Sequence, residues 1–223
     1  FQNALSYYRE WESLRSFYWQ LTRRVPAMET GTLLVLDGTP FNYHVDRFMT
    51  PALNWAYAPE LETLTYKYSH LGFYKFEDTY LNASDPGQVI TRNNGTTRFE
   101  TTISKSVFLT YNAPDCLHVV DSGSIYQFDY ADFSDGFERA LGWSDPGMIQ
   151  TDAQPTAFPA SLGKAPADDW CLFYQRADLA RQQGDWAQIL SIYEDTARLG
   201  LRPGNPLEWH PFLEALIRAN RTE

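Results

Sequence analysis

Apolar residues recur at two periods along this chain, one typical of helices and one typical of strands. Between residues 3 and 25 they return every three or four positions, which predicts one long amphipathic helix that Pro26 ends. Its apolar face holds Leu5, Tyr8, Trp11, Leu14, Tyr18, Leu21 and Val25. The apolar run 32–36 then predicts a short buried strand, which the turn residues 37–40 close.

The following segments complete the pattern of an α/β fold. Thr50 followed by Pro51 predicts an N-cap and the first residue of a helix over 51–57. Two β-prone arms, 89–93 and 96–101, flank Asn94-Gly95, a strong signal for a tight hairpin. Further strands are predicted over the runs 106–111 and 116–120. We therefore expect a mixed sheet flanked by helices, with at least one antiparallel section.

A polar, acidic stretch separates these elements from the C-terminal part. Nine acidic and two basic residues lie between Asp121 and Asp169, with four prolines among them. A helical turn is expected over 133–141 and a long surface connection elsewhere. The predicted organisation is an α/β domain over 1–121, an acidic proline-containing connection over 122–169 and a helical part over 170–223.

The last part of the chain predicts a small all-α unit. Apolar residues at helical spacing indicate helices over about 170–183, 186–199 and 206–218, and Gly200 with Pro203 is typical of a helix end. The first two helices are joined by Gly184-Asp185, which predicts a helical hairpin. That hairpin resembles a tetratricopeptide repeat in its turn, Gln183-Gly184-Asp185-Trp186, and in the positions of Tyr174, Ala177, Tyr193 and Ala197.

Composition narrows the classes of function. The chain has 223 residues, 18 basic against 28 acidic side chains and a formal net charge of −10. This charge disfavours binding to nucleic acid, whose affinity comes largely from Lys and Arg at phosphates, and adsorption to an anionic membrane. No run approaches the roughly 20 apolar residues of a membrane span, and with neither an initiator Met nor a signal peptide the chain is expected to be an excised fragment or a processed protein.

The two cysteines and four histidines form no metal-binding motif. Cys116 and Cys171 are 55 residues apart, without a second cysteine or a histidine at ligand spacing. Two interpretations stay open for them: one disulfide, as in an oxidising compartment, or two buried free thiols. The sequence therefore predicts no metal site and no cofactor.

A wider resemblance follows from short motifs kept in order along the chain. The motifs are Tyr18-Trp19-Gln20-Leu21-Thr22, Pro26, Gly31-Thr32-Leu33-Leu34, Leu53-Asn54-Trp55-Ala56-Tyr57, Cys116-Leu117-His118-Val119-Val120-Asp121 and Ala180-Arg181-Gln182-Gln183-Gly184-Asp185-Trp186. With these motifs the chain resembles the C-terminal soluble region of large bacterial polytopic membrane proteins, some of which are similar to glycosyltransferases of the C superfamily. The resemblance implies an extracytoplasmic region, tethered to the membrane through a preceding part of the parent protein. It carries no catalytic residue onto this chain, so any sugar-transfer chemistry would lie elsewhere in the parent.

One small polar constellation is a candidate binding site. Asp37 ends the predicted buried strand, and His44 with Asp46 lies in the segment that follows. Ligands of open α/β sheets bind beyond the carboxyl ends of strands, where such groups contact sugar hydroxyls or transfer protons. The competing interpretation is a turn-forming Asp and a surface His. Among the aromatic residues, those at helical spacing are expected in the core, whereas an exposed set is expected at Tyr66, Tyr68, Phe73, Tyr74 and Phe76.

Three hypotheses for function follow. The first is a non-catalytic extracytoplasmic module of a bacterial membrane protein that binds a partner protein or a glycan. The second is an accessory domain of a membrane glycosyltransferase, which contacts the acceptor through the segment from Asp37 to Asp46. The third is a self-assembling cell-surface protein. The sequence leaves open the ligand, the oligomeric state and the reaction of the parent protein.

Overall fold

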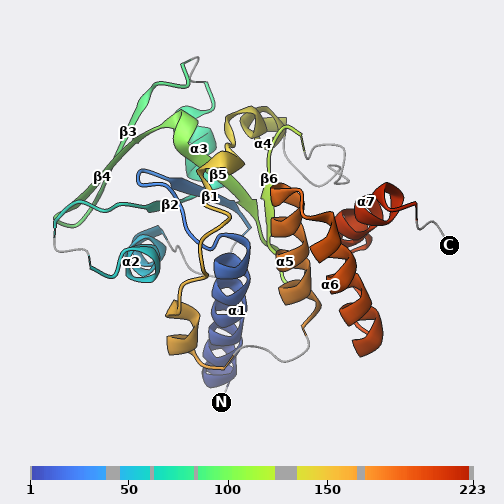
Figure 1. The fold of residues 1–223 in the computed structure, drawn as a ribbon. Coiled ribbons are helices and arrows are strands. Elements are labelled where there is room, and N and C mark those ends of the chain that lie inside the picture. Colours follow the sequence, from blue (N-terminus) through green and yellow to red (C-terminus); the bar gives the residue numbers. More distant parts are fainter. Residues whose placement is uncertain are drawn as a thin grey trace.

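The structure is a computed structural model of the 223-residue chain, and it describes residues 2–38, 46–60, 63–82, 85–123, 135–164 and 169–220. It has the expected α/β architecture: a four-stranded mixed sheet lies at the centre, helices cover it, and a helical C-terminal part packs beside it (Figure 1). A two-stranded hairpin forms a second, separate sheet.

The central sheet has the strand order β2-β1-β5-β6. In it, β1 (Leu33–Asp37) lies parallel to both β2 (Ser69–Gly72) and β5 (Ser106–Thr110), whereas β6 (His118–Val120) runs antiparallel to β5. The antiparallel section predicted from the sequence is therefore confirmed at the β5–β6 edge. All five residues of β5 and all three of β6 are buried, as expected of strands that are covered on both faces.

Two helices cover one face of this sheet. Side chains alternate across a strand, so Leu34 and Leu36 of β1 point to the face covered by α1 (Gln2–Arg24) and α2 (Asp46–Tyr57). The start predicted for α2 is wrong: the helix begins at Asp46, before Thr50, and Pro51 lies inside it. The Thr50 hydroxyl accepts a hydrogen bond from the backbone N–H of His70 on β2 (3.1 Å), so this residue joins helix to sheet and does not cap the helix.

The opposite face carries an aromatic core. Here α3 (Phe73–Tyr80), α4 (Asp135–Ala140) and the hairpin of β3 (Val89–Asn94) and β4 (Thr97–Thr102) pack on Leu33 and Val35. The hairpin turn is confirmed, with Gly95 in the left-handed region at φ +64°. Rings of Phe73, Phe76, Phe108 and Phe137 meet mostly edge to face, at centroid distances of 4.8–6.3 Å.

Strand β2 and helix α3 have no counterpart among the predicted elements. Ser-His-Leu-Gly lacks the β-branched residues of a typical strand, so its local β-propensity is low. Pairing with β1 stabilises the strand instead. The aromatic set expected at the surface is mostly wrong. Phe73 and Phe76 belong to α3 and are buried in the aromatic core, and Tyr68 is buried in the core on the other face of the sheet, whereas Tyr74 is 47% exposed.

The acidic stretch contributes apolar side chains to the core where the structure describes it, while its carboxylates such as Glu138 and Asp152 are exposed. Residues 135–164 form α4 and the 3-10 helices η4 (Leu141–Trp143), η5 (Pro146–Met148) and η6 (Phe158–Leu162). Their apolar side chains enter the cores on both faces of the sheet: Phe137, Ala140, Leu141, Met148, Ile149 and Phe158. The helical turn expected over 133–141 is confirmed by α4 in its described part. The surface connection expected for the rest is wrong where Met148, Ile149 and Phe158 enter the core. Residues 124–134 and 165–168 lie outside the described residues. The domain boundaries themselves stay a prediction.

The helical C-terminal part matches its sequence pattern closely. Helix α5 (Trp170–Gln183) ends at Gly184, and α6 (Trp186–Leu199) ends at Gly200; both glycines are left-handed caps. Asp185 caps the start of α6 through a hydrogen bond from the Gln188 N–H (2.9 Å). The 3-10 turn η7 (Pro206–Trp209) and α7 (His210–Arg218) follow, which confirms the hairpin and the third helix.

Phe137 tests whether the acidic stretch belongs to the core. Its side chain is fully buried against Phe73 and Phe108, so Phe137→Ala should lower the free energy of unfolding by about 3–5 kcal/mol in urea denaturation. Leu199→Ala, at a 45% exposed position on α6, is the control and should change it by less than about 0.5 kcal/mol. A similar small effect of Phe137→Ala would contradict the packing described here.

Candidate functional site

The predicted site residue Asp37 lies at a topological switch point of the sheet. It is the last residue of β1, and the helices that follow the neighbouring strands β1 and β2 pack on opposite faces. Open α/β sheets bind ligands in the crevice that such a change of face leaves beyond the carboxyl ends of the strands. The geometry therefore places Asp37 where a ligand site is expected.

The surroundings of Asp37 are only partly described. Burial raises the pKa of its carboxyl above the ordinary value, the Gly38 N–H opposes this, and the charge of Glu77 adds to it. Gly38 must be glycine, because at its φ of +82° a Cβ atom would lie 2.1 Å from the Tyr111 carbonyl oxygen. His44 lies outside the described residues. Asp46 begins α2, but its side chain also lies outside them, so their convergence on Asp37 stays a prediction.

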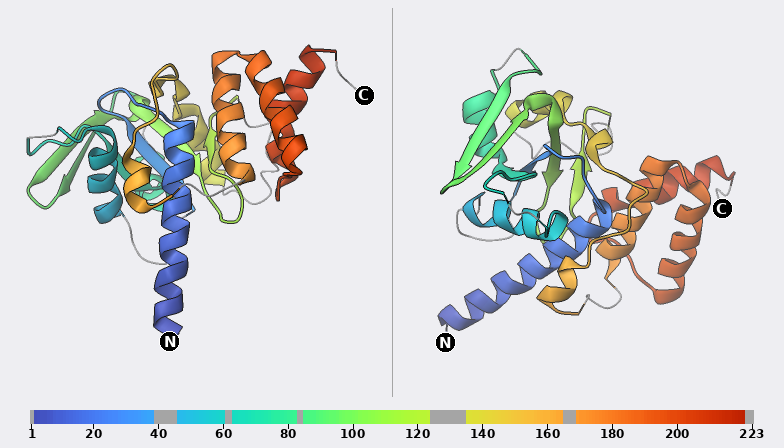
Figure 2. Two further views of the ribbon diagram at one scale, coloured as in Figure 1. Left: turned by 60° about the horizontal axis from the view of Figure 1, so that its bottom comes forward. Right: turned by 60° about the vertical axis from the view of Figure 1, so that its left-hand side comes forward.

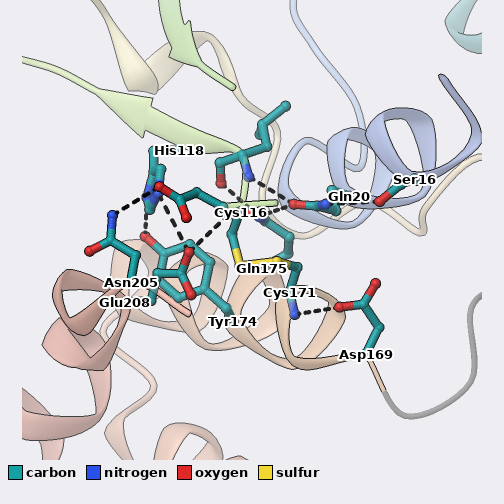
Figure 3. The surroundings of a disulfide bond; sticks show 12 residues. Ser16, Gln20, Cys116, His118, Asp169, Cys171, Tyr174, Gln175, Asn205 and Glu208 are labelled. Carbon is teal, nitrogen blue, oxygen red and sulfur yellow. Dashed lines mark hydrogen bonds and ion pairs between the residues drawn. A yellow bond between two sulfur atoms is a disulfide. The ribbon is translucent and has the colours of Figure 1, made fainter. Parts of the chain in front are cut away.

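A second polar cluster lies at the junction between the sheet and the helical C-terminal part (Figure 3). Its centre is the segment Cys116-Leu117-His118 at the start of β6. The Cys116 N–H donates to Glu208 of η7 (2.8 Å), and the Leu117 N–H donates to Gln20 of α1 (2.7 Å). The Leu117 carbonyl accepts from Gln175 of α5 (2.6 Å). Three separate helical elements thus bind consecutive backbone groups of one segment.

A disulfide crosslinks the same segment. Cys116 and Cys171, at the first turn of α5, are bonded, and their Cα atoms lie 5.1 Å apart. This settles the two interpretations left open by the sequence in favour of the disulfide. Both cysteines are buried, and the Asp169 side chain caps α5 by accepting from the Cys171 N–H (2.9 Å).

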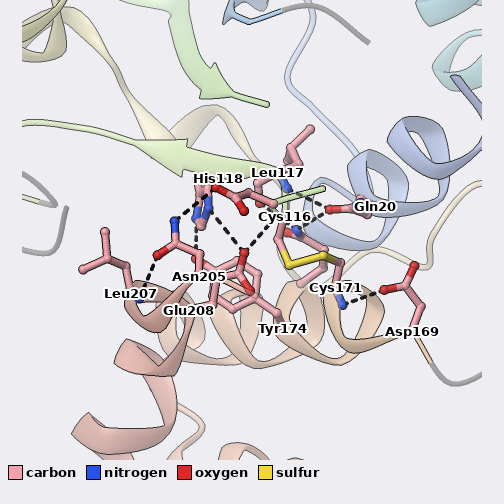
Figure 4. Close-up of polar contacts among 12 residues, drawn as sticks. Gln20, Cys116, Leu117, His118, Asp169, Cys171, Tyr174, Asn205, Leu207 and Glu208 are labelled. Atoms are coloured by element: carbon pink, nitrogen blue, oxygen red, sulfur yellow. Dashed lines mark hydrogen bonds and ion pairs between the residues drawn. A yellow bond between two sulfur atoms is a disulfide. The ribbon is translucent and has the colours of Figure 1, made fainter. Parts of the chain in front are cut away.

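His118, Tyr174 and Glu208 form the titratable part of the cluster (Figure 4). His118 Nδ1 and the Tyr174 hydroxyl are 2.8 Å apart, and His118 Nε2 lies 4.0 Å from Glu208 Oε1. Burial lowers the pKa of His118 to about 4, against the opposing charges of Asp178 and Asp115, so the imidazole is neutral at pH 7. Burial raises the pKa of Glu208 to about 7. These three side chains can hold a proton between them, but all three are buried and contact one another.

A buried ion pair continues the junction on its α1 side. Arg24 of α1 donates to Asp178 of α5 at 2.6 Å, and Arg181 donates to the other carboxylate oxygen at 3.0 Å. Burial by itself would raise the pKa of Asp178, but the charges and hydrogen bonds of Arg24 and Arg181 outweigh it and hold the pKa at about 2. Asp178 therefore stays ionised and joins α1 to the helical hairpin.

Sequence reasoning singled out none of these junction residues as a site. Three buried polar residues lie in helices, next to the apolar positions that face the core: Gln20, Gln175 and Asp178. A polar residue at such a position must find a partner when it is buried, and this is the sequence signal that would have identified them. The Cys116–His118 motif was noted, but its partners are 50 or more residues away along the chain. Among the described residues, ligand atoms of Cys116, Cys171 and Glu208 lie within 4.8 Å of one another, a grouping suited to a metal ion.

Comparisons of the chain with protein-family models, with curated proteins and with solved structures found no match. Within the described ranges, every helix is too short or too polar to cross a bilayer. Evidence about function therefore comes from the fold, from the surroundings of Asp37 and from the polar cluster around Cys116 and His118.

The buried ion pair makes a pH-dependent contribution to stability. Asp178→Asn leaves Arg24 buried without its anion, so the free energy of unfolding at pH 7 should fall by about 3–5 kcal/mol. The folded pKa, about 2, is lower than the ordinary 3.8. The stabilisation is therefore present above pH 4, and the gap between wild type and variant should narrow by about 2 kcal/mol as the pH falls from 4 to 2.

Urea denaturation at several pH values measures both effects. The matched control is Asp195→Asn, which removes an exposed i,i+3 ion pair with Arg198 and should cost less than about 1 kcal/mol. Equal losses for the two variants would show that the buried pair does not join the helices.

Proposed function

We propose that this chain is a non-catalytic, extracytoplasmic interaction module of a bacterial membrane protein. The observation that carries the proposal is the disulfide between Cys116 and Cys171, which is built into the junction that holds the helical part on the sheet. Disulfides persist in oxidising compartments outside the cytoplasm and are rare in reducing ones. The resemblance to extracytoplasmic regions of polytopic membrane proteins supports the same location.

The N-terminal half of α1 supports a role in contacting a partner. This half projects away from the body of the molecule (Figure 2), and its apolar side chains are exposed among the residues that the structure describes. The exposed fractions are 56% at Leu5, 68% at Tyr7, 62% at Tyr8 and 43% at Trp11. The prediction of a buried Trp11 is wrong, because α1 extends beyond the sheet and only the C-terminal half of the helix packs on it.

The chemistry of this surface fits a protein or a glycan partner. Tyr and Trp bury large apolar areas, carry a polar tip, and are enriched where proteins bind one another. Their rings also stack on other flat apolar surfaces, and sugar rings have such surfaces. Near Trp11 the charges of Arg9 and Arg15 are balanced by Glu10 and Glu12, so this projection lacks the acidic excess of the chain as a whole.

A topology reporter tests the location. In the parent reading frame, alkaline phosphatase fused after Glu223 should be active, because this enzyme folds only where disulfides form, and a green fluorescent protein at the same position should stay dark. Cys116 and Cys171 should resist alkylation in cell extracts prepared without reductant. A fluorescent fusion together with alkylated cysteines would contradict the proposal.

The glycosyltransferase hypothesis stays as a second candidate because of the switch point at Asp37. A partly buried carboxyl beyond the end of β1 is suited to accept hydrogen bonds from sugar hydroxyls. On this view the module contacts the acceptor while a membrane part of the parent transfers the sugar.

Substitution of Asp37 and Asp46 in the parent distinguishes the two candidates. If the module contacts the acceptor, Asp37→Asn with Asp46→Asn should raise the KM for the acceptor by about tenfold or more, the loss of about one charged hydrogen bond, with kcat little changed. Asp152→Asn, at an exposed carboxylate of the acidic stretch, is the control. Unchanged transfer in the double variant would remove the glycosyltransferase hypothesis.

A further inference from the structure

We propose that Cys116, Cys171 and Glu208 form a binding site for a zinc-type divalent cation when the disulfide is reduced. The proposal goes beyond the interaction module and does not depend on it. It concerns a second chemical state of the same junction, in which a metal ion replaces the covalent crosslink.

The geometry brings three ligand groups together from three parts of the chain. The sulfurs of Cys116 and Cys171 are close because they are bonded to each other, and the independent observation is that a carboxylate oxygen of Glu208 lies within 4.8 Å of both. All three residues are buried. Cys116 precedes β6, Cys171 lies in the first turn of α5, and Glu208 lies in η7 (Figures 3 and 4). The Cys116 N–H fixes the Glu208 carboxylate through a 2.8 Å hydrogen bond.

Metal coordination requires only small movements of these groups. Ligands at about 2.0–2.3 Å from a tetrahedral zinc ion are about 3.5–3.8 Å apart, so the carboxylate must approach the sulfurs slightly while the freed sulfurs separate. Rotation of the two cysteine side chains is the movement that the proposal requires, starting from Cα atoms 5.1 Å apart.

The donor set selects the class of metal. Two thiolates and one carboxylate suit zinc and related thiophilic ions, whereas magnesium and calcium take oxygen ligands alone. His118 stands next to the group, with Nε2 4.0 Å from Glu208 Oε1 and Nδ1 held by Tyr174. The ring nitrogens of His118 are not among the ligand atoms that lie within 4.8 Å of one another, so the proposed site has the three protein ligands Cys116, Cys171 and Glu208.

Two steps convert the crosslink into the metal site: reduction of the disulfide and binding of the cation. A dithiol reductant passes two electrons and two protons to the disulfide; the S–S bond breaks, two thiols form, and the reductant becomes a disulfide. Binding of the divalent cation then releases the two thiol protons to solvent, since the thiolate is the ligand. In the reverse step an oxidised dithiol takes up two electrons from the thiolates and two protons from solvent, the Cys116–Cys171 bond forms again, and the metal ion is released.

Cobalt(II) absorption tests this site in the intact 223-residue chain. The chain is reduced with a soluble phosphine, which does not add competing thiols, and Co²⁺ is titrated in without oxygen. One Co²⁺ per chain should bind with the near-ultraviolet absorption of thiolate-to-cobalt charge transfer, and equimolar Zn²⁺ should abolish that absorption. The oxidised chain should show none.

Variants decide whether the folded junction is the binding site. Glu208→Gln should keep its hydrogen bond from Cys116 but weaken Co²⁺ binding by at least about tenfold, while Glu138→Gln, an exposed carboxylate on α4, should bind like wild type. Cys116→Ser with Cys171→Ser should lose the charge-transfer absorption. Circular dichroism of each reduced protein with and without Zn²⁺ reports whether the chain is folded.

Two results would overturn the proposal. The first is a reduced wild-type chain without charge-transfer absorption at saturating Co²⁺. The second is equal Co²⁺ affinity of wild type and Glu208→Gln, which is the result expected if free thiols of an unfolded chain bind the ion. Neither result bears on the location or on the partner of the module, which the reporter fusions and the acceptor kinetics test separately.

Discussion

The hydrogen bonds of Cys116, Leu117 and His118 are the constraint on which the arrangement of the helices depends. This segment leads into β6, which is the last strand of the sheet among the residues that the structure describes. A buried backbone N–H or carbonyl without a partner costs free energy comparable to a lost hydrogen bond, so the groups must be satisfied by other elements. Here Gln20, Gln175 and Glu208 satisfy them, and in doing so they fix α1, α5 and η7 around the edge of the sheet.

The same interactions explain why polar side chains are tolerated inside this junction. Gln20, Gln175, Asp178 and Glu208 are each at most 4% exposed, and each has a hydrogen-bond partner on a different element. Polar contacts of this kind demand particular distances and directions, whereas apolar packing tolerates several arrangements. The helical hairpin therefore sits at one defined position on the sheet, and the disulfide adds a covalent constraint at that position.

The polar groups of the junction stabilise the fold, and while the disulfide is intact they are not open to a ligand. The junction holds a carboxyl, an imidazole, a phenol and a disulfide, which are the groups of many active sites, yet they are buried against one another. What the molecule presents outward is different: an aromatic helix end and a carboxyl at the switch point of the sheet. This division is consistent with the proposal of a module that binds a partner.

The sequence by itself determined the elements whose signals are local. The long N-terminal helix, the Asn94-Gly95 hairpin and the hairpin of α5 and α6 follow from the spacing of apolar residues and from turn glycines, which act within a few positions. Their bounds were predicted within a few residues. The mixed sheet was expected from the predicted strands over 32–36, 106–111 and 116–120 and from the hairpin, which the structure places in a separate sheet.

Only the tertiary structure decided the features that depend on distant contacts. Strand β2 exists because β1 pairs with it, Phe137 is buried because Phe73 and Phe108 meet it, and Cys116 bonds Cys171 because Gln20 and Gln175 bring their elements together. Trp11 is exposed because α1 is longer than the sheet that it covers. Such contacts join residues far apart along the chain, and their energies depend on packing and burial that no local pattern records.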